Sequence, residues 1–194
     1  MTVIRAFIAV ELPEELHKKL ANISSSLNEQ LENLPIRWVP AENIHLTLKF
    51  LGDVSQANVD MITKILQTIA HQHKIFELSV GGFGVFPNFN RPRVLWVGIE
   101  APDELLHLQH RIEAEAARLG YAPDERAFSP HLTLGRVSRN ANPQEVRQIS
   151  EVLRRQKLGF LGAARISQIH LFRSDLQQGG AVYTQLFSAP LNAE

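Results

Sequence analysis

Cysteine is absent from this sequence of 194 residues. Its absence excludes disulfide bonds, thiolate catalysis and zinc sites built on cysteine. The chain also has no excess of charge of either sign, because 20 Lys and Arg residues balance 20 Asp and Glu residues. A protein that wraps long nucleic acid usually has a basic excess, since each phosphate contact needs a cation. The balance therefore favours a small phosphorylated ligand or the end of a nucleic acid over a duplex.

Long hydrophobic runs are absent as well. No apolar stretch approaches the roughly 20 residues that are needed to span a bilayer. The segment Met1–Arg5 leads to an acidic residue at Glu11 without the apolar core or the small-residue cleavage site of a signal peptide. We therefore expect a cytoplasmic protein with no membrane partner. Because the sequence has no heptad pattern, we also expect a monomer.

An internal duplication organises the chain. Residues 5–12 predict a strand, and a helix follows from Pro13, where a proline and two acids favour a first helical turn. Residues 93–100 repeat the strand, and residues 102–119 repeat the proline-led helix. Each half then reaches the same tetrapeptide, His-Leu-Thr-Leu.

A helix and a strand follow each copy of the tetrapeptide. In the first half they are residues 56–70 and 76–86, and in the second half a helix from Pro143 and a strand at 165–172. A last strand is predicted at 181–187. The order β-α-β-α-β, twice, indicates an α+β fold with two antiparallel or mixed sheets facing a central cleft and helices outside.

No linker separates independent domains. We expect a single domain over residues 1–194, made of two pseudo-symmetric halves at about 1–90 and 91–194. The halves would form two similar lobes with a shared cleft between them.

The repeated tetrapeptide is the main functional signal. Successive side chains of a strand point to opposite faces, so His45 and Thr47 share one face, and His131 and Thr133 do the same. The leucines between them would pack against helices. If a pseudo-two-fold axis relates the lobes, two imidazoles and two hydroxyls surround one small volume.

Two histidines facing a substrate suit acid–base catalysis. An imidazole has an ordinary pKa of about 6.5, so one ring can accept a proton while the other donates one. Such positioned proton transfers contribute roughly 10²–10⁴-fold to a rate. The hydroxyls of Thr47 and Thr133 can donate hydrogen bonds to phosphoryl oxygens, and Arg136 can add a fixed, bidentate positive charge. This scheme needs no cofactor and no metal.

Two other interpretations of the repeat remain at this point. Duplication alone could preserve both copies, although the helices around them have diverged almost completely. Two histidines from facing strands could also bind zinc, but zinc normally takes three or four protein ligands. No carboxylate stands at a matching offset in both copies, so we rank the metal site below acid–base catalysis.

The motifs and their flanks resemble a known family. It is the bacterial and archaeal RNA 2′,3′-cyclic phosphodiesterases, formerly called 2′-5′ RNA ligases, of the two-histidine (2H) phosphoesterase superfamily. The segments that carry the resemblance are Arg5–Val10, Arg37–Gly52, Pro92–Gly98 and Pro130–Arg136. The resemblance implies a bilobal fold, hydrolysis of RNA 2′,3′-cyclic phosphates to 2′-phosphates, and reversible ATP-independent 2′-5′ joining of tRNA halves.

The same resemblance implies roles for individual residues. His45 would donate a proton to the departing 3′ oxygen, and His131 would accept one from water. Thr47, Thr133 and Arg136 would hold the phosphate, and the partner would be an RNA end. The sequence is nearly symmetric and does not itself decide which histidine is the acid.

A base next to the phosphate needs an aromatic platform, because stacking contributes roughly 1–3 kcal/mol per base. The candidates are Trp38 and Phe7, followed by Phe50 and Trp96, although aromatic residues in strands more often belong to the core. Three basic residues could line a groove toward RNA: Arg37, Lys49 and Arg91.

Two alternative functions fit the same motifs. One is a 2H phosphoesterase that acts on a small nucleotide cyclic phosphate or on a 2′-5′ oligonucleotide. The other is a non-catalytic protein that binds RNA ends in the same cleft.

Overall fold

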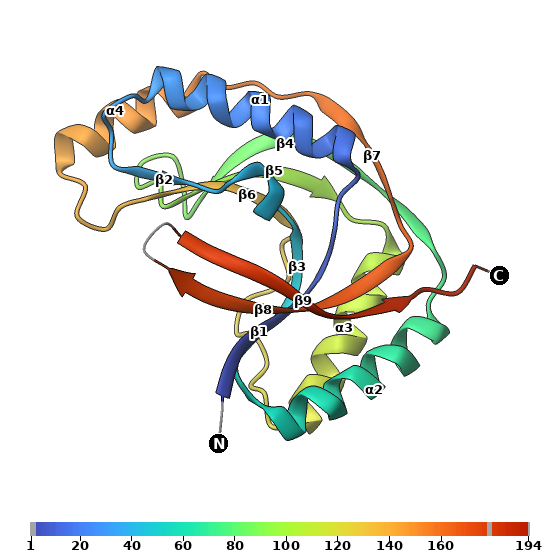
Figure 1. Cartoon of the computed structure of the whole chain (residues 1–194). Coiled ribbons are helices and arrows are strands. Elements are labelled where there is room, and N and C mark those ends of the chain that lie inside the picture. The colour runs from blue at the N-terminus through green and yellow to red at the C-terminus, as the bar shows by residue number, and fades with distance from the viewer. Residues whose placement is uncertain (1–2, 178–179, 194) are drawn as a thin grey trace.

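The computed structural model of the chain describes residues 3–177 and 180–193 (Figure 1). Met1 and Thr2, which begin the N-terminal segment considered above, lie outside the described residues. The described elements, in chain order, are β1 (Val3–Val10), α1 (Glu14–Gln30), β2 (Ile36–Trp38), the 3₁₀ helix η1 (Ala41–Asn43), β3 (Leu46–Ser55), α2 (Gln56–Gln72), β4 (Phe76–Phe86), β5 (Val94–Glu100), α3 (Asp103–Arg118), β6 (His131–Val137), α4 (Pro143–Arg154), β7 (Phe160–Ile166), β8 (Gln168–Gln177) and β9 (Gly180–Pro190).

The strands form two antiparallel sheets. A four-stranded sheet has the order β3-β1-β8-β9, and a five-stranded sheet has the order β2-β6-β5-β4-β7. Helices α2 and α3 pack beside the four-stranded sheet, and α1 and α4 lie over the five-stranded sheet (Figure 1). The predicted α+β fold with two facing sheets and outer helices is confirmed. None of the helices in the described residues has both the length and the apolar character that crossing a membrane requires.

Both sequence halves contribute strands to each sheet. The four-stranded sheet combines β1 and β3 of the first half with β8 and β9 of the second. The five-stranded sheet combines β2 and β4 of the first half with β5, β6 and β7 of the second. Neither lobe is therefore formed by one half alone, so the expectation that the two halves form one lobe each is wrong, because strands of the two halves pair within each sheet.

Two short features differ from the predicted elements. The strand predicted at 165–172 is two strands, β7 and β8, which meet at Ser167 and belong to different sheets. Strand β2 was not predicted, because three residues are too short to show an alternating pattern. Strand β7 is rich in glycine and alanine, so it also lacks that pattern.

Leucines of the repeated motif lie in the hydrophobic core, as predicted. Leu46, Leu48, Leu132 and Leu134 are at most 2% exposed and belong to one core cluster. Full burial of a leucine contributes about 1.5–3 kcal/mol. This packing fixes which face of each strand the intervening polar residues occupy.

Lys49 is placed differently from the prediction. The pairing of β1 with β3 has two irregularities, and Lys49 stands opposite Ile8, a core residue on the helix side. Its Nζ donates hydrogen bonds to Glu113 Oε1 at 2.5 Å and to the Ala122 carbonyl oxygen at 2.8 Å. At 1% exposed, Lys49 joins β3 to α3. The prediction that it lines a groove is wrong, because the irregular register turns it away from the cleft.

Candidate active site

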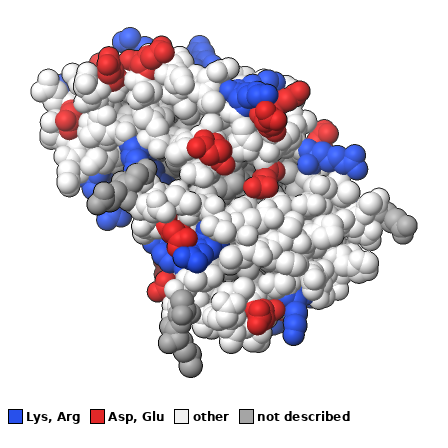
Figure 2. Space-filling model, in the orientation of Figure 1, with Lys and Arg blue, Asp and Glu red and all other residues white. Residues whose placement is uncertain are grey.

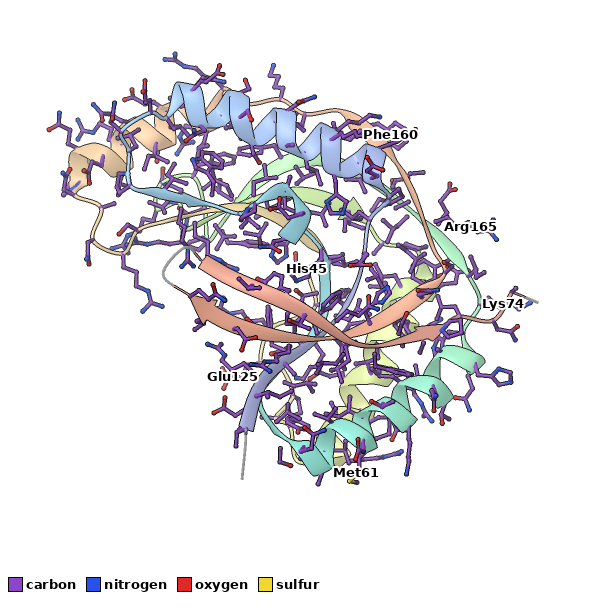
Figure 3. The ribbon with its side chains drawn as sticks, in the orientation of Figure 1. His45, Met61, Lys74, Glu125, Phe160 and Arg165 are labelled. Carbon is purple, nitrogen blue, oxygen red and sulfur yellow. The ribbon has the colours of Figure 1, made fainter. Side chains whose placement is uncertain are left out.

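The two histidines of the repeat start equivalent strands of the two facing sheets. His45 directly precedes β3, and His131 is the first residue of β6. Strands β3 and β6 contact each other across the molecule, and Figure 3 shows His45 between the sheets. Both imidazoles are half-buried.

A backbone carbonyl orients the His45 ring. Its Nδ1 donates to the carbonyl oxygen of Asn43 at 2.8 Å, and its Nε2 lies 3.0 Å from Thr47 Oγ1. Because a carbonyl only accepts, Nδ1 carries the proton in the neutral ring. Nε2 then has a free lone pair, which accepts the Thr47 hydroxyl proton.

His131 repeats this arrangement in the other lobe. Its Nδ1 donates to the carbonyl oxygen of Ser129 at 2.7 Å, again two residues upstream. Nε2 is therefore the basic nitrogen of both rings. Thr133 lies two residues along the strand from His131, opposite Trp96 of β5.

Aromatic rings pack against the His45 imidazole. Phe7 stacks on its imidazole with ring centroids 4.7 Å apart, and Phe172 stacks on Phe7 at 5.3 Å. Tyr183 of β9 approaches the His45 ring edge-on at 5.2 Å. Phe7 is 2% exposed, so it has no free face on which a base could stack. The structure places Phe7 at the site as a support for His45.

Another aromatic group surrounds His131. Phe86 meets its ring edge-on at 4.9 Å, and Trp96 lies 6.4 Å from it. The Trp96 indole covers Gly84, where an added Cβ would stand 2.2 Å from the ring. Glycine at that position therefore leaves room for the Trp96 indole, whose plane is tilted by 57° from the His131 ring.

Trp38 is not placed in the cleft with the histidines. It stands opposite Gly135, next to the pair formed by Ile36 and Val137. Val137 is in the hydrophobic core, and both Trp38 and Ile36 pack against that core. Facing residues of paired strands share one side of a sheet, so Trp38 lies on the helix side. Among the predicted aromatic residues, Phe50 has the exposed ring, at 61% exposed and 5.9 Å from Phe7.

Arg136 and Arg37 stand opposite each other on β6 and β2. Partial burial, and then the charge of Arg37, lower the pKa of Arg136. Burial raises the pKa of the Tyr183 phenol, and the two guanidinium groups oppose this shift. Tyr183 belongs to the other sheet, so the arginine pair faces it across the cleft. The charge of Arg136 also acts on His131, which links the arginines to the second histidine.

Burial lowers the pKa of both histidines. For His45 the pKa falls to about 4, because desolvation outweighs the hydrogen bond to Asn43, and the charge of His17 lowers it further. For His131 desolvation also dominates, the Ser129 carbonyl opposes it, and the charge of Arg136 adds to it. Both rings are therefore neutral at pH 7 in the free protein. A ring that serves as an acid must gain its proton when an anion binds.

Some residues of this arrangement were not predicted from the sequence. The sequence shows Tyr183, Phe172 and Phe86 only as members of predicted strands, because nothing local in β9, β8 or β4 indicates which strand is its neighbour. Arg37 was predicted to line the groove and stands beside Arg136. Arg91 lies in the loop between β4 and β5, outside the group around the histidines.

Metal binding was the competing interpretation of the histidines. Within residues 3–177 and 180–193, no three His, Cys, Asp or Glu side chains form a group that could hold a metal ion. Among the described residues, the polar groups that contact or neighbour the two imidazoles are the hydroxyl of Thr47, the phenol of Tyr183 and the guanidinium of Arg136, none of which is a carboxylate.

Two facing antiparallel sheets, each presenting a His-x-Thr strand to the other, define the class of two-histidine phosphoesterases. The family described as LigT like Phosphoesterase matches residues 10–96 and again residues 97–183. The chain belongs to this family of hydrolases.

Relatives support this assignment over nearly the whole chain. The RNA 2′,3′-cyclic phosphodiesterase of Methanothermobacter thermautotrophicus is 34% identical over 94% of this chain and 96% of its own. The protein of the same name from Aquifex aeolicus is 30% identical over 95% of both chains. Among solved structures, TT0787 of Thermus thermophilus has a TM-score of 0.80 and 28% identity, covering 98% of this chain and all of that one. Escherichia coli LigT complexed with 3′-AMP has a TM-score of 0.77 and 26% identity, covering 98% of this chain and 99% of that one.

Proposed function

We propose that this protein hydrolyses RNA 2′,3′-cyclic phosphate ends to 2′-phosphates by metal-independent acid–base catalysis with His45 and His131. The observation that supports this most strongly is the matched orientation of the two rings. Each imidazole donates Nδ1–H to a carbonyl two residues upstream, which leaves Nε2 as the reactive nitrogen. The names of the relatives supply the substrate class.

The proposed reaction exchanges one P–O bond for another. His131 Nε2 accepts a proton from water as its oxygen attacks the phosphorus. The P–O3′ bond breaks, and His45 Nε2–H gives its proton to the departing 3′ oxygen. The product has a 2′-phosphate and a 3′-hydroxyl, and the two histidines recover their protonation states by exchange with solvent. The assignment of His45 as the acid follows the family resemblance.

Thr47 has a part in this scheme that depends on the charge of His45. In the free protein its hydroxyl donates to the lone pair of His45 Nε2. When Nε2 gains a proton, it can no longer accept, so the hydroxyl is released to donate to a phosphoryl oxygen. Thr133 and Arg136 would hold the other oxygens, where negative charge increases in the transition state. Phosphate binding and His45 protonation would therefore support each other.

The wider proposals follow from this reaction. If a 5′-hydroxyl replaced water as the nucleophile, its oxygen would attack the cyclic phosphate and the P–O3′ bond would break, which would join two RNA ends by a 2′-5′ linkage without ATP. We propose that residues 1–194 act as one domain of two pseudo-symmetric halves, as a cytoplasmic monomer whose partner is an RNA end. Phe50 is the exposed ring on which a terminal base would stack.

A substrate panel tests the proposed function. We expect purified protein to hydrolyse an oligoribonucleotide that ends in a 2′,3′-cyclic phosphate, with the same rate in the presence and absence of EDTA. The panel also contains a 2′,3′-cyclic mononucleotide and a 2′-5′ oligoadenylate, with turnover measured by chromatography. Faster turnover of either small substrate would favour a 2H phosphoesterase that acts on a small nucleotide cyclic phosphate or on a 2′-5′ oligonucleotide. Binding of the RNA end without turnover would favour a non-catalytic protein, and loss of activity in EDTA would favour a metal site.

A further inference from the structure

A second group of arginines lies outside the cleft. A surface cavity of about 570 Å³ is formed by the loop between β4 and β5, the segment before α4, and α4 itself. Its charged lining residues are Arg91, Arg93, Arg147, Arg154 and Glu151. Four positive charges against one negative charge give the lining a formal charge of +3, in a chain whose formal net charge is zero.

Two of these arginines are fixed by the protein. Arg93 donates from Nη1 to the Ser138 carbonyl oxygen at 2.7 Å. Arg154 donates to the Asn90 side chain, and its guanidinium lies 5.7 Å from the centre of the Phe89 ring. These contacts connect the loop, the segment before α4 and the helix, so the cavity has defined walls.

The other two arginines are free to meet a ligand. Arg91 and Arg147 are exposed, and neither forms a salt bridge within the part of the chain that the structure describes. The nearby N-terminus of α4 is already capped, because Asn142 accepts from the backbone N–H of Glu145, whose side chain accepts in return. The affinity of this cavity for anions therefore rests on guanidinium groups.

The backbone connects the cavity to the strands that carry the candidate active site. Val94 pairs with Arg136 in the five-stranded sheet, and Arg93 precedes Val94. Arg93 is therefore one residue along the backbone from the cross-strand partner of Arg136. The β4–β5 loop and α4 lie at the same end of the molecule as the β8–β9 hairpin (Figure 1). Lys and Arg side chains gather around that hairpin end, whereas both signs are mixed elsewhere on the visible face (Figure 2).

We propose that the arginine cavity is a second RNA site, which binds backbone phosphodiesters on the 5′ side of the cyclic phosphate end. This inference rests on the proposed function, since the RNA must enter the cleft by its 3′ end. Guanidinium groups bind phosphate oxygens in a bidentate manner, and phosphate contacts carry no sequence information. The cavity would therefore favour longer RNA over a mononucleotide without regard to sequence.

The test removes the two free charges with Arg91→Gln and Arg147→Gln together. The double variant is assayed on a 12-nucleotide RNA with a 2′,3′-cyclic phosphate end and on a 2′,3′-cyclic mononucleotide. We expect kcat/KM on the 12-mer to fall about tenfold and its dependence on log[salt] to become shallower by about 1.4, which is the slope for two single-strand phosphate contacts. We expect kcat/KM on the mononucleotide to stay unchanged.

A matched control removes two exposed charges from the other side of the molecule. Lys74→Gln with Arg165→Gln makes the same change in net charge, and Figure 3 shows both residues at the opposite end of the molecule from helix α4 of Figure 1. We expect the control variant to have the wild-type kcat/KM on both substrates. Equal losses on the 12-mer and the mononucleotide, or no loss on the 12-mer, would overturn the proposal. Binding of inorganic phosphate that is lost in the double variant, with unchanged 12-mer kinetics, would identify a small-anion site and also overturn it.

Failure of the proposed function can be told apart from failure of this inference. If wild-type protein turns over no cyclic phosphate, the proposed function fails. The arginine cavity is then tested by fluorescence anisotropy with a labelled 12-mer that ends in a 3′-phosphate. A Kd that rises about tenfold in the double variant and not in the control supports the RNA site, and an unchanged Kd contradicts it.

Discussion

Replacing His45 or His131 by glutamine is expected to lower kcat on a cyclic phosphate end by about 10²–10⁴-fold, with little change in KM. Glutamine keeps a hydrogen-bonding side chain but neither accepts nor delivers a proton at neutral pH. Each ring makes its contribution in the transition state, because proton transfer accompanies water attack and departure of the 3′ oxygen. Single-turnover and steady-state kinetics on the same oligonucleotide measure the loss.

The control for this prediction is His110→Gln. His110 is exposed on α3 and does not belong to either copy of the repeated motif. It should leave kcat and KM unchanged. If either His45→Gln or His131→Gln retained the wild-type kcat while the protein remained active, acid–base catalysis by this pair would be ruled out.

The titration of His45 is expected to lower the free energy of unfolding as pH decreases from about 6.5 to about 4. The pKa of His45 is lowered from 6.5 to about 4 by burial, so the unfolded chain binds a proton in this range before the folded protein does. The contribution of neutral His45 is fully present above pH 6.5 and is lost as pH falls to about 4. A shift of this size corresponds to about 3 kcal/mol in the free energy of unfolding.

Denaturant unfolding of wild type and His45→Gln at several pH values isolates this contribution. The other buried groups titrate in both proteins, so the difference between their unfolding free energies reports His45. We expect the wild type to lose about 3 kcal/mol relative to the variant between pH 7 and pH 4. A difference that is independent of pH would show that the imidazole is hydrated and titrates normally in the folded protein.

Local sequence pattern is sufficient to predict the fold class and the two strands that carry the repeated motif. The leucines of the repeat alternate with His and Thr, and a period of two residues decides which side chains enter the core. Proline followed by acids marked the starts of α1 and α3, where Pro13 and Pro102 directly precede the helices. These signals are short-range, so they need no knowledge of which strands are neighbours.

Features that depend on register could not be predicted. Lys49 belongs to the core side because irregular pairing of β1 and β3 shifts the alternation. Trp38 and Phe7 are aromatic residues of strands, and only the packed structure shows that one faces helices and the other lies beneath His45. Tyr183 reaches His45 because β9 joins a sheet that begins in the first half of the chain.

The most direct test of the proposed mechanism is the identity of the product from an oligoribonucleotide with a 2′,3′-cyclic phosphate end. Phosphorus NMR of the reaction with metal-free protein distinguishes a terminal 2′-phosphate from a 3′-phosphate. We expect the 2′-phosphate alone, because in the proposed mechanism His45 protonates the departing 3′ oxygen while His131 activates water. A 3′-phosphate product, or no product at all, would contradict it.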